Sequence, residues 1–240
     1  MSYVLILWAF VAVACKAQAQ EPAIQPELIL ELGNKYFDAI DYLQKNMWII
    51  DTMKNEGVSP DIALSAVIPS MLRYSGLRDI VETGAMRTLY IQSGRKYSHY
   101  SVGRFQMKPS FAEMVERTYM RQKLGDVKFV VNNSSKARAE RAKRLESKEW
   151  QVQYLIMFYK IMEKRYAHIE WRNKEDKARF YATAYDVGFN RDERTIRRMM
   201  SPKTTNRRVL NRKVKNVNSK YRTGDVAVWF IMNDAYKFVP

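Results

Sequence analysis

Residues 61–75 read DIALSAVIPSMLRYS, and apolar side chains occupy most positions of this stretch. A helix that is apolar on most of its sides is typical of the buried centre of a domain. Ser59-Pro60-Asp61 marks its start, because proline is favoured in the first helical turn. Pro69 is expected to kink or interrupt the helix, since proline lacks the backbone N–H that the helix needs. The stretch therefore predicts a buried central helix.

The segments on either side of this stretch predict more helices. Residues 29–54 carry apolar groups at helical spacing and predict an amphipathic helix. The polar stretch 132–148 is interpreted as either a flexible insertion or an exposed helix. The remaining predictions are helices at 77–92, 109–123, 149–167 and 175–188, a Tyr-, Ser- and Gly-rich loop at 94–103, and a closing apolar run at 225–236 that packs back on the core.

The composition agrees with a helical chain. Only 9 of the 240 residues are glycine and 7 are proline, which favours long helices over a turn-rich β-sandwich. No internal repeat, heptad pattern or low-complexity linker divides the chain. We therefore expect a mainly α fold with a single domain over residues 21–240.

The first twenty residues predict export. A short apolar run at 4–14 is followed by Ala17-Gln18-Ala19, a small-x-small cleavage pattern, so residues 1–20 read as a secretory signal peptide. Cys15 leaves lipid anchoring open as the alternative. The expected location is periplasmic or secreted. After cleavage no cysteine remains, and the two histidines lack metal-ligand spacing, so we expect no metal and no other cofactor.

The charge indicates an anionic partner. The formal net charge is +16, and the most basic part of the chain is the stretch 197–222, which is predicted to be loop-like. Anionic polymers of the cell envelope and nucleic acid both fit such a charge. Nucleic acid is disfavoured because Tyr221 is the one aromatic residue in this stretch that can stack on a base.

Two short motifs carry a resemblance to a known family. Residues 103–109 read GRFQMKP and residues 180–188 read FYATAYDVG. In this order, after a buried helix, they resemble the G-L-M-Q-x-x-P and A-x-Y-N-x-G segments of the lytic transglycosylase and goose-type lysozyme superfamily. The resemblance spans residues 61–190 and implies a lysozyme-like helical domain that binds peptidoglycan glycan strands. The substrate-binding residues that it implies are Gly103, Gln106, Met107, Tyr185 and Asp186.

The physical properties of these residues suit a glycan cleft. Gly103 permits close approach to the backbone, Gln106 offers a donor and an acceptor to an acetamido group, and Tyr185 combines ring packing with a hydroxyl. The alternative interpretation is ordinary structure, with glycine in a turn or helix cap and the glutamine and tyrosine in helix packing.

The expected catalytic acid is missing from its position. The family pattern places a glutamate after Ile-x-Pro on the buried helix, and this chain has Ser70 there. A serine hydroxyl cannot protonate a glycosidic oxygen as a carboxylic acid does. Asp79 and Glu82 are the nearest acids, and Glu82 is the candidate acid in a shifted alignment, unless it only pairs with Arg78 on an exposed helix.

Three hypotheses remain open at this point. The first is a peptidoglycan-cleaving enzyme of the lytic transglycosylase type, with Glu82 as its general acid and base. The second is an inactive glycan-binding protein with Ser70 in the vacated position of the acid. The third hypothesis is a basic nucleic-acid-binding protein.

Overall fold

The computed structural model describes residues 28–200 and 221–239. Helices make up nearly all of the regular structure in these ranges, and the one β-type pairing among them is an isolated bridge between Val102 and Met107. Buried side chains from Leu28 to Phe238 form one hydrophobic cluster. The predicted mainly α, single-domain fold is confirmed. The predicted signal peptide at 1–20, with Cys15, and residues 201–220 of the basic stretch lie outside the described residues.

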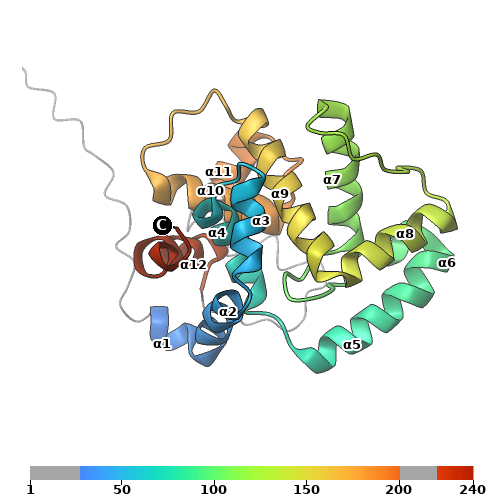
Figure 1. The fold of residues 1–240 in the computed structure, drawn as a ribbon, viewed down its shortest axis with the longest axis horizontal. Helices are drawn as coiled ribbons and strands as arrows, with labels where there is room; N and C mark the ends of the chain where they lie inside the picture. Colours follow the sequence, from blue (N-terminus) through green and yellow to red (C-terminus); the bar gives the residue numbers. More distant parts are fainter. Residues whose placement is uncertain (1–27, 201–220, 240) are drawn as a thin grey trace, which may run out of the picture.

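The predicted central helix is present as α4 (Pro60–Met71), and all of its residues are buried. Its neighbours are α10 (Lys174–Val187) and α12 (Thr223–Asn233), which both pack against it at the centre of the molecule (Figure 1). The helix runs through Pro69 and ends two residues later, so this proline does not interrupt it. The missing N–H leaves the Ser65 carbonyl without its intrahelical bond, but the loss is confined to the last turn and the helix still reaches Met71.

The predicted helix at 29–54 is divided into α1 (Leu28–Leu32), α2 (Asn34–Lys45) and α3 (Trp48–Asn55). The first break is at Gly33, whose φ of 55° is in the left-handed region. The second is at Asn46–Met47, where the chain turns before α3 packs beside α9 (Lys148–Arg165) (Figure 1). The apolar spacing correctly predicted helical structure. It continues across both turns, so it did not show that the segment is divided into three helices.

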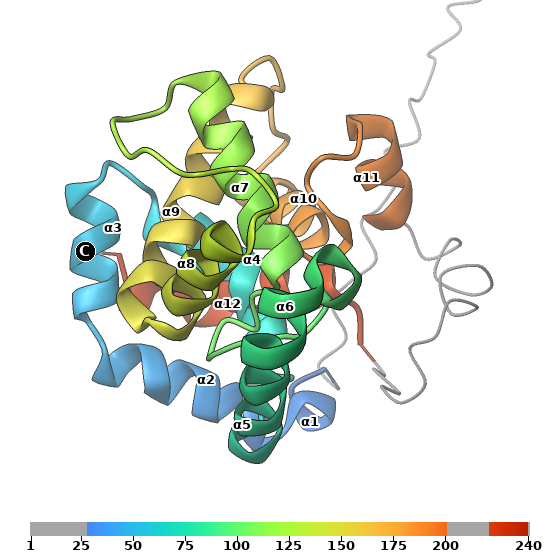
Figure 2. The same cartoon turned by 90° about the vertical axis from the view of Figure 1, so that its right-hand side faces the viewer.

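The stretch predicted as a helix at 77–92 is α5 (Gly76–Ala85), a π-helical turn at Met86–Tyr90 and α6 (Ile91–Ser93). The segment from α5 to α6 lies along one edge of the molecule (Figures 1 and 2), and α5 buries none of its residues. The predicted loop at 94–103 contains a short 3-10 turn at Gly94–Tyr97. Residues 98–108 then return toward the core.

The polar stretch 132–148 is neither a flexible insertion nor an exposed helix. It forms α8 (Ser135–Glu146), which packs beside α9 and α7 (Pro109–Gln122) and buries one face. Arg141 on this face is only 1% exposed, and its guanidinium binds the buried Glu116 carboxylate at 2.6 Å and the Tyr90 hydroxyl at 2.7 Å. A buried cation is tolerated here because a carboxylate and a hydroxyl compensate it.

The last helices also modify one prediction. Arg197 and Arg198, predicted as part of a loop, lie on α11 (Glu193–Met200), where Arg197 pairs with Glu193 at 2.7 Å. A 3-10 turn at Ala235–Lys237 follows α12 and closes the described chain. No helix of the described ranges is long and apolar enough to span a bilayer.

Candidate functional site

A small hollow of about 40 Å³ lies where the C-terminal ends of α4 and α10 meet the 102–108 loop and the start of α7. The residues that line it are Ser70, Arg73, Gln106, Met107, Lys108, Phe111, Tyr185 and Asp186. The structure thus brings together Ser70 and four of the five predicted binding residues. Glu82 does not line the hollow, and Gly103 lies in the supporting loop.

The loop that carries the first motif is held by its own backbone. Val102 and Met107 each donate an N–H to the other's carbonyl oxygen, at 2.9 and 3.1 Å. Inside this closed turn Gly103 has a φ of 70° and Gln106 a φ of 53°. The Gln106 side-chain amide donates to the Gly103 carbonyl at 2.9 Å, which supports a conformation that only glycine adopts easily.

Gly103 allows a close approach, but the approaching group belongs to this chain. A Cβ at this position would lie 1.7 Å from Nε2 of Gln151. The Gln151 amide crosses under the loop, donates to the Leu145 carbonyl at 2.7 Å and accepts the Phe105 N–H at 3.2 Å. The glycine therefore has a packing role, which differs from the predicted contact between Gly103 and a sugar.

The second residue of the motif, Arg104, anchors the loop on its outer side. Its guanidinium lies between the rings of Tyr42 and Tyr74, 4.9 and 4.7 Å from their centroids, and donates to the Asp38 carbonyl at 2.8 Å. These two cation–π contacts hold a long side chain that would otherwise be free in solvent.

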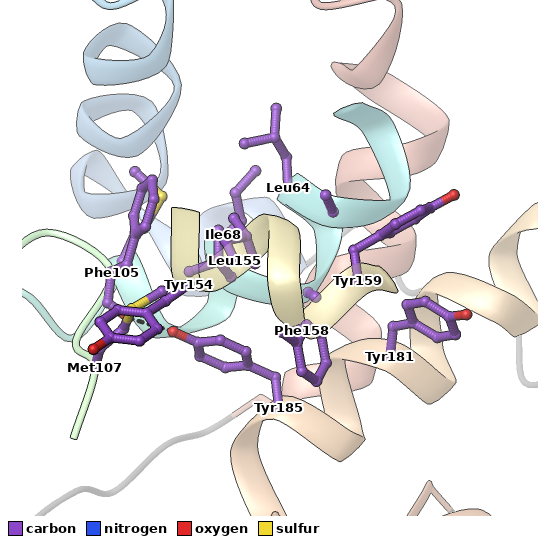
Figure 3. Close-up of a cluster of buried hydrophobic side chains, with 14 of the residues drawn as sticks. Leu64, Ile68, Phe105, Met107, Tyr154, Leu155, Phe158, Tyr159, Tyr181 and Tyr185 are labelled. Atoms are coloured by element: carbon purple, nitrogen blue, oxygen red, sulfur yellow. Dashed lines mark hydrogen bonds between the residues drawn. The ribbon is translucent and has the colours of Figure 1, made fainter. Parts of the chain in front are cut away.

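Tyr185 joins the two motifs. Its hydroxyl donates to the Phe105 carbonyl at 3.0 Å, and its ring packs between Met107 and Phe158 (Figure 3). Burial raises the pKa of this hydroxyl well above its ordinary value. The hydroxyl is engaged within the protein, so Tyr185 and the buried Met107 build the wall of the hollow from the core side.

Polar groups at the mouth of the hollow are organised by Arg73. Its Nη2 donates to the Ser70 hydroxyl at 2.8 Å and pairs with the Asp186 carboxylate at 3.1 Å. The Thr223 hydroxyl donates to the other Asp186 oxygen at 3.2 Å. The Arg73 and Asp186 side chains are each about one-third exposed, at 33% and 35%, so both remain accessible to a ligand.

Glu82 has a different environment on α5. Its carboxylate pairs with Arg78 at 2.6 Å and accepts the Ser101 N–H at 2.5 Å. Asp79, one turn earlier, accepts the Gly103 N–H at 2.6 Å. Burial raises the pKa of Asp79, an effect opposed by the Gly103 N–H and increased by the Glu82 charge. The two carboxylates fix the start of the 101–107 loop and point to its backbone.

The polar groups of the hollow can form hydrogen bonds and ion pairs with a ligand. Ser70 has no acidic proton of suitable pKa, and the carboxylate of Asp186 pairs with the Arg73 guanidinium at 3.1 Å. Arg73 and the exposed Lys108 supply positive charge, and Lys108 has no ion pair with any described residue. The Gln106 side-chain carbonyl also accepts no hydrogen bond from the described chain.

Sequence reasoning missed three lining residues. Arg73 was visible in the stretch that carries Ser70, three positions later in the predicted helix, so the i,i+3 rule could have identified it, although the structure places it in the turn after α4. Lys108 lies within the first motif and Phe111 two positions after it, but no sequence pattern distinguishes them from surface and core residues.

Within residues 28–200 and 221–239, no group of histidine, cysteine, aspartate and glutamate side chains could hold a metal ion. Comparisons of the chain with protein-family models, curated proteins and solved structures gave no match.

Proposed function

We propose that this chain is an exported glycan-binding protein with a lysozyme-like architecture, which holds peptidoglycan-type strands without cleaving them. One observation carries the proposal: the two motifs behind the family resemblance, 80 positions apart at Phe105 and Tyr185, are joined by a hydrogen bond beside one hollow. The buried helix contributes Ser70 to the same hollow, at the position where the resemblance expects an acid.

The lining matches the groups that such a strand presents. Peptidoglycan strands carry acetamido groups, hydroxyls and carboxylates. Arg73 and Lys108 supply cationic donors for carboxylates, the Gln106 carbonyl accepts from an acetamido N–H, and Asp186 accepts from hydroxyls. Phe111 provides an apolar wall for a sugar face.

Three observations favour binding over cleavage. The Ser70 hydroxyl is buried and bound by Arg73, so the expected acid position holds no carboxyl group. Asp186 is paired with the same guanidinium. Glu82, the predicted substitute, is bound to Arg78 and the Ser101 N–H outside the hollow. The resemblance expects a carboxylic acid as the general acid, and the one carboxyl group that lines the hollow, Asp186, is held by Arg73.

The experiment combines binding and lysis on the same protein. We expect the chain to cosediment with purified peptidoglycan sacculi and to leave their turbidity unchanged. Arg73→Gln should weaken binding about tenfold or more, because it removes charged hydrogen bonds in the hollow. Arg78→Gln removes the same charge from α5, outside the hollow, and should retain binding.

Ser70→Glu tests the vacated position. Lysis that appears only in this variant supports the proposal, whereas a variant as inert as the parent contradicts the assignment of Ser70. Wild-type lysis that disappears in Glu82→Gln would instead establish an active enzyme and overturn the proposal.

A further inference from the structure

Helix α5 exposes its apolar face to solvent. Leu77, Ile80 and Val81 are 76%, 72% and 64% exposed, and their i, i+3, i+4 spacing forms one stripe along the helix, which we call the α5 stripe. A surface helix ordinarily turns such a stripe toward the core. Here α5 lies along the lower edge of the molecule (Figure 1), and none of its residues is buried. The described part of the chain therefore leaves the α5 stripe uncovered.

The polar face of α5 points to the body of the protein. Asp79 and Glu82 accept the backbone N–H groups of Gly103 and Ser101, at 2.6 and 2.5 Å. Successive residues of an α-helix are about 100° apart, so these two carboxylates lie roughly opposite the α5 stripe. The helix is thus oriented with its acidic side on the loop and its apolar side in solvent. Because hydrogen bonds fix this orientation, the exposure of the stripe is part of the fold.

The exposed charges near the α5 stripe are basic. In residues 76–97, which run from α5 through the following turns, the exposed charged residues are Arg78, Arg87, Arg95 and Lys96. The two acids of the same segment are only partly exposed. Arg78 and Arg87 pair with Glu82 and Glu146, but ion pairs of such exposed arginines are weak in water, so a lipid phosphate can compete for them. The segment therefore presents an apolar stripe with positive charge beside it.

Two surfaces could cover this stripe, a second copy of the chain or a membrane. A stable dimer buries about 800 Å² on each partner. Three side chains on a ten-residue helix form a patch of only about a few hundred Å², and a second copy would bring the same basic residues to the contact. A membrane surface requires less area, since an amphipathic helix inserts its apolar face about 5–10 Å deep while basic residues bind anionic headgroups. Area and charge thus favour the membrane.

We propose that α5 docks on the surface of an anionic phospholipid membrane. The helix lies in the plane of the headgroups, the α5 stripe inserts at the boundary with the acyl chains, and Arg78 and Arg87 bind lipid phosphates beside it. The docking surface is separate from the glycan-binding hollow, which α5 does not line. Membrane docking therefore does not depend on the proposed glycan binding.

The test is cosedimentation with vesicles of equal parts phosphatidylglycerol and phosphatidylcholine. Residues 21–240 are used, because they contain the whole described fold and lack the apolar run 4–14, which could insert by itself. We expect binding that Ile80→Ser/Val81→Ser weakens about tenfold or more, since the charge is unchanged and only apolar insertion is lost. Val127→Ser/Val130→Ser is the matched control, because both valines are exposed in the connection between α7 and α8, and it should change the affinity less than about twofold.

Lipid charge and self-association complete the test. Vesicles of phosphatidylcholine alone should bind the parent about tenfold more weakly or less, and Arg78→Gln/Arg87→Gln should weaken binding to the mixed vesicles about fivefold or more. The proposal is overturned if Ile80→Ser/Val81→Ser binds the mixed vesicles as the parent does, if the matched control loses as much, or if either charge comparison shows no difference. Sedimentation velocity should give a monomer, and a dimer that Ile80→Ser/Val81→Ser abolishes would overturn the proposal by assigning the α5 stripe to a second copy.

Discussion

Replacing Gly103 with alanine tests how the 101–107 loop is supported. The new Cβ would lie 1.7 Å from Nε2 of Gln151 and 2.5 Å from its Cδ, so the Gln151 amide must move. Movement breaks the hydrogen bonds to the Leu145 carbonyl and the Phe105 N–H, both of which are buried. Each unpaired buried group costs about 1–3 kcal/mol of folding free energy.

The backbone adds a second, smaller cost. At a φ of 70° an alanine costs about 1–2 kcal/mol relative to glycine. Gly103→Ala is therefore expected to lower the free energy of unfolding by about 3–8 kcal/mol in total. Gly57 is the matched control, because its φ is 68° and an added Cβ would meet no atom within 4 Å, so Gly57→Ala should cost only about 1–2 kcal/mol.

Urea unfolding followed by circular dichroism measures both variants. The expected difference between them is at least about 2 kcal/mol, the cost of the displaced Gln151 hydrogen bonds. The reasoning is refuted if Gly103→Ala and Gly57→Ala lose the same stability, because the close approach of Gln151 would then have no energetic consequence.

Urea unfolding of four further variants tests the buried charges and the link between the motifs. Burial raises the pKa of Asp79 in the folded protein, so ionisation of this carboxyl group destabilises the fold as the pH rises through that pKa. Asp79→Asn should therefore raise the unfolding midpoint at pH 7 and have no effect near pH 3, where the carboxyl group is protonated. Burial alone would raise the pKa of Asp61, but hydrogen bonds from Lys174, Ser59 and the Ile62 N–H lower it, so Asp61→Asn should destabilise the protein at pH 7 and progressively less as the pH falls below about 4. An opposite order of the two variants at pH 7 would contradict both assignments. Arg141→Met leaves the buried Glu116 without its main partner and should cost about 3–5 kcal/mol, and a loss below about 1 kcal/mol would show that the pair is not buried. Tyr185→Phe removes one hydrogen bond to the loop and should cost about 1 kcal/mol, whereas no measurable loss would exclude the Tyr185 hydroxyl as a link between the motifs.

The sequence was sufficient for the helices that carry a continuous apolar pattern. The stretch 61–75 indicated a buried helix because apolar side chains occupy most of its positions, and α4 is buried throughout. The turn at Asn46–Met47 could not be predicted, since neither residue is glycine or proline and the periodicity continues across it. The turn depends on where α3 packs, which is a tertiary property.

Long-range charge pairs explain the other differences. Residues 132–148 looked solvated because they are rich in arginine and lysine, yet Arg141 is buried against Glu116, 25 positions earlier. Similarly, Arg73 and Asp186 meet across 113 positions. A single sequence records each charge but does not show which charges meet, so the motifs predicted the region of the hollow and not its ion pair.

Chemical-shift mapping with a soluble peptidoglycan fragment tests the glycan-binding hollow most directly. If the account is correct, titration of a muramyl-containing tetrasaccharide will shift the amide signals around Arg73, Gln106–Lys108 and Tyr185–Asp186, and Arg73→Gln will reduce the affinity about tenfold or more. No saturable shifts, or shifts confined to α5 around Glu82, would contradict it.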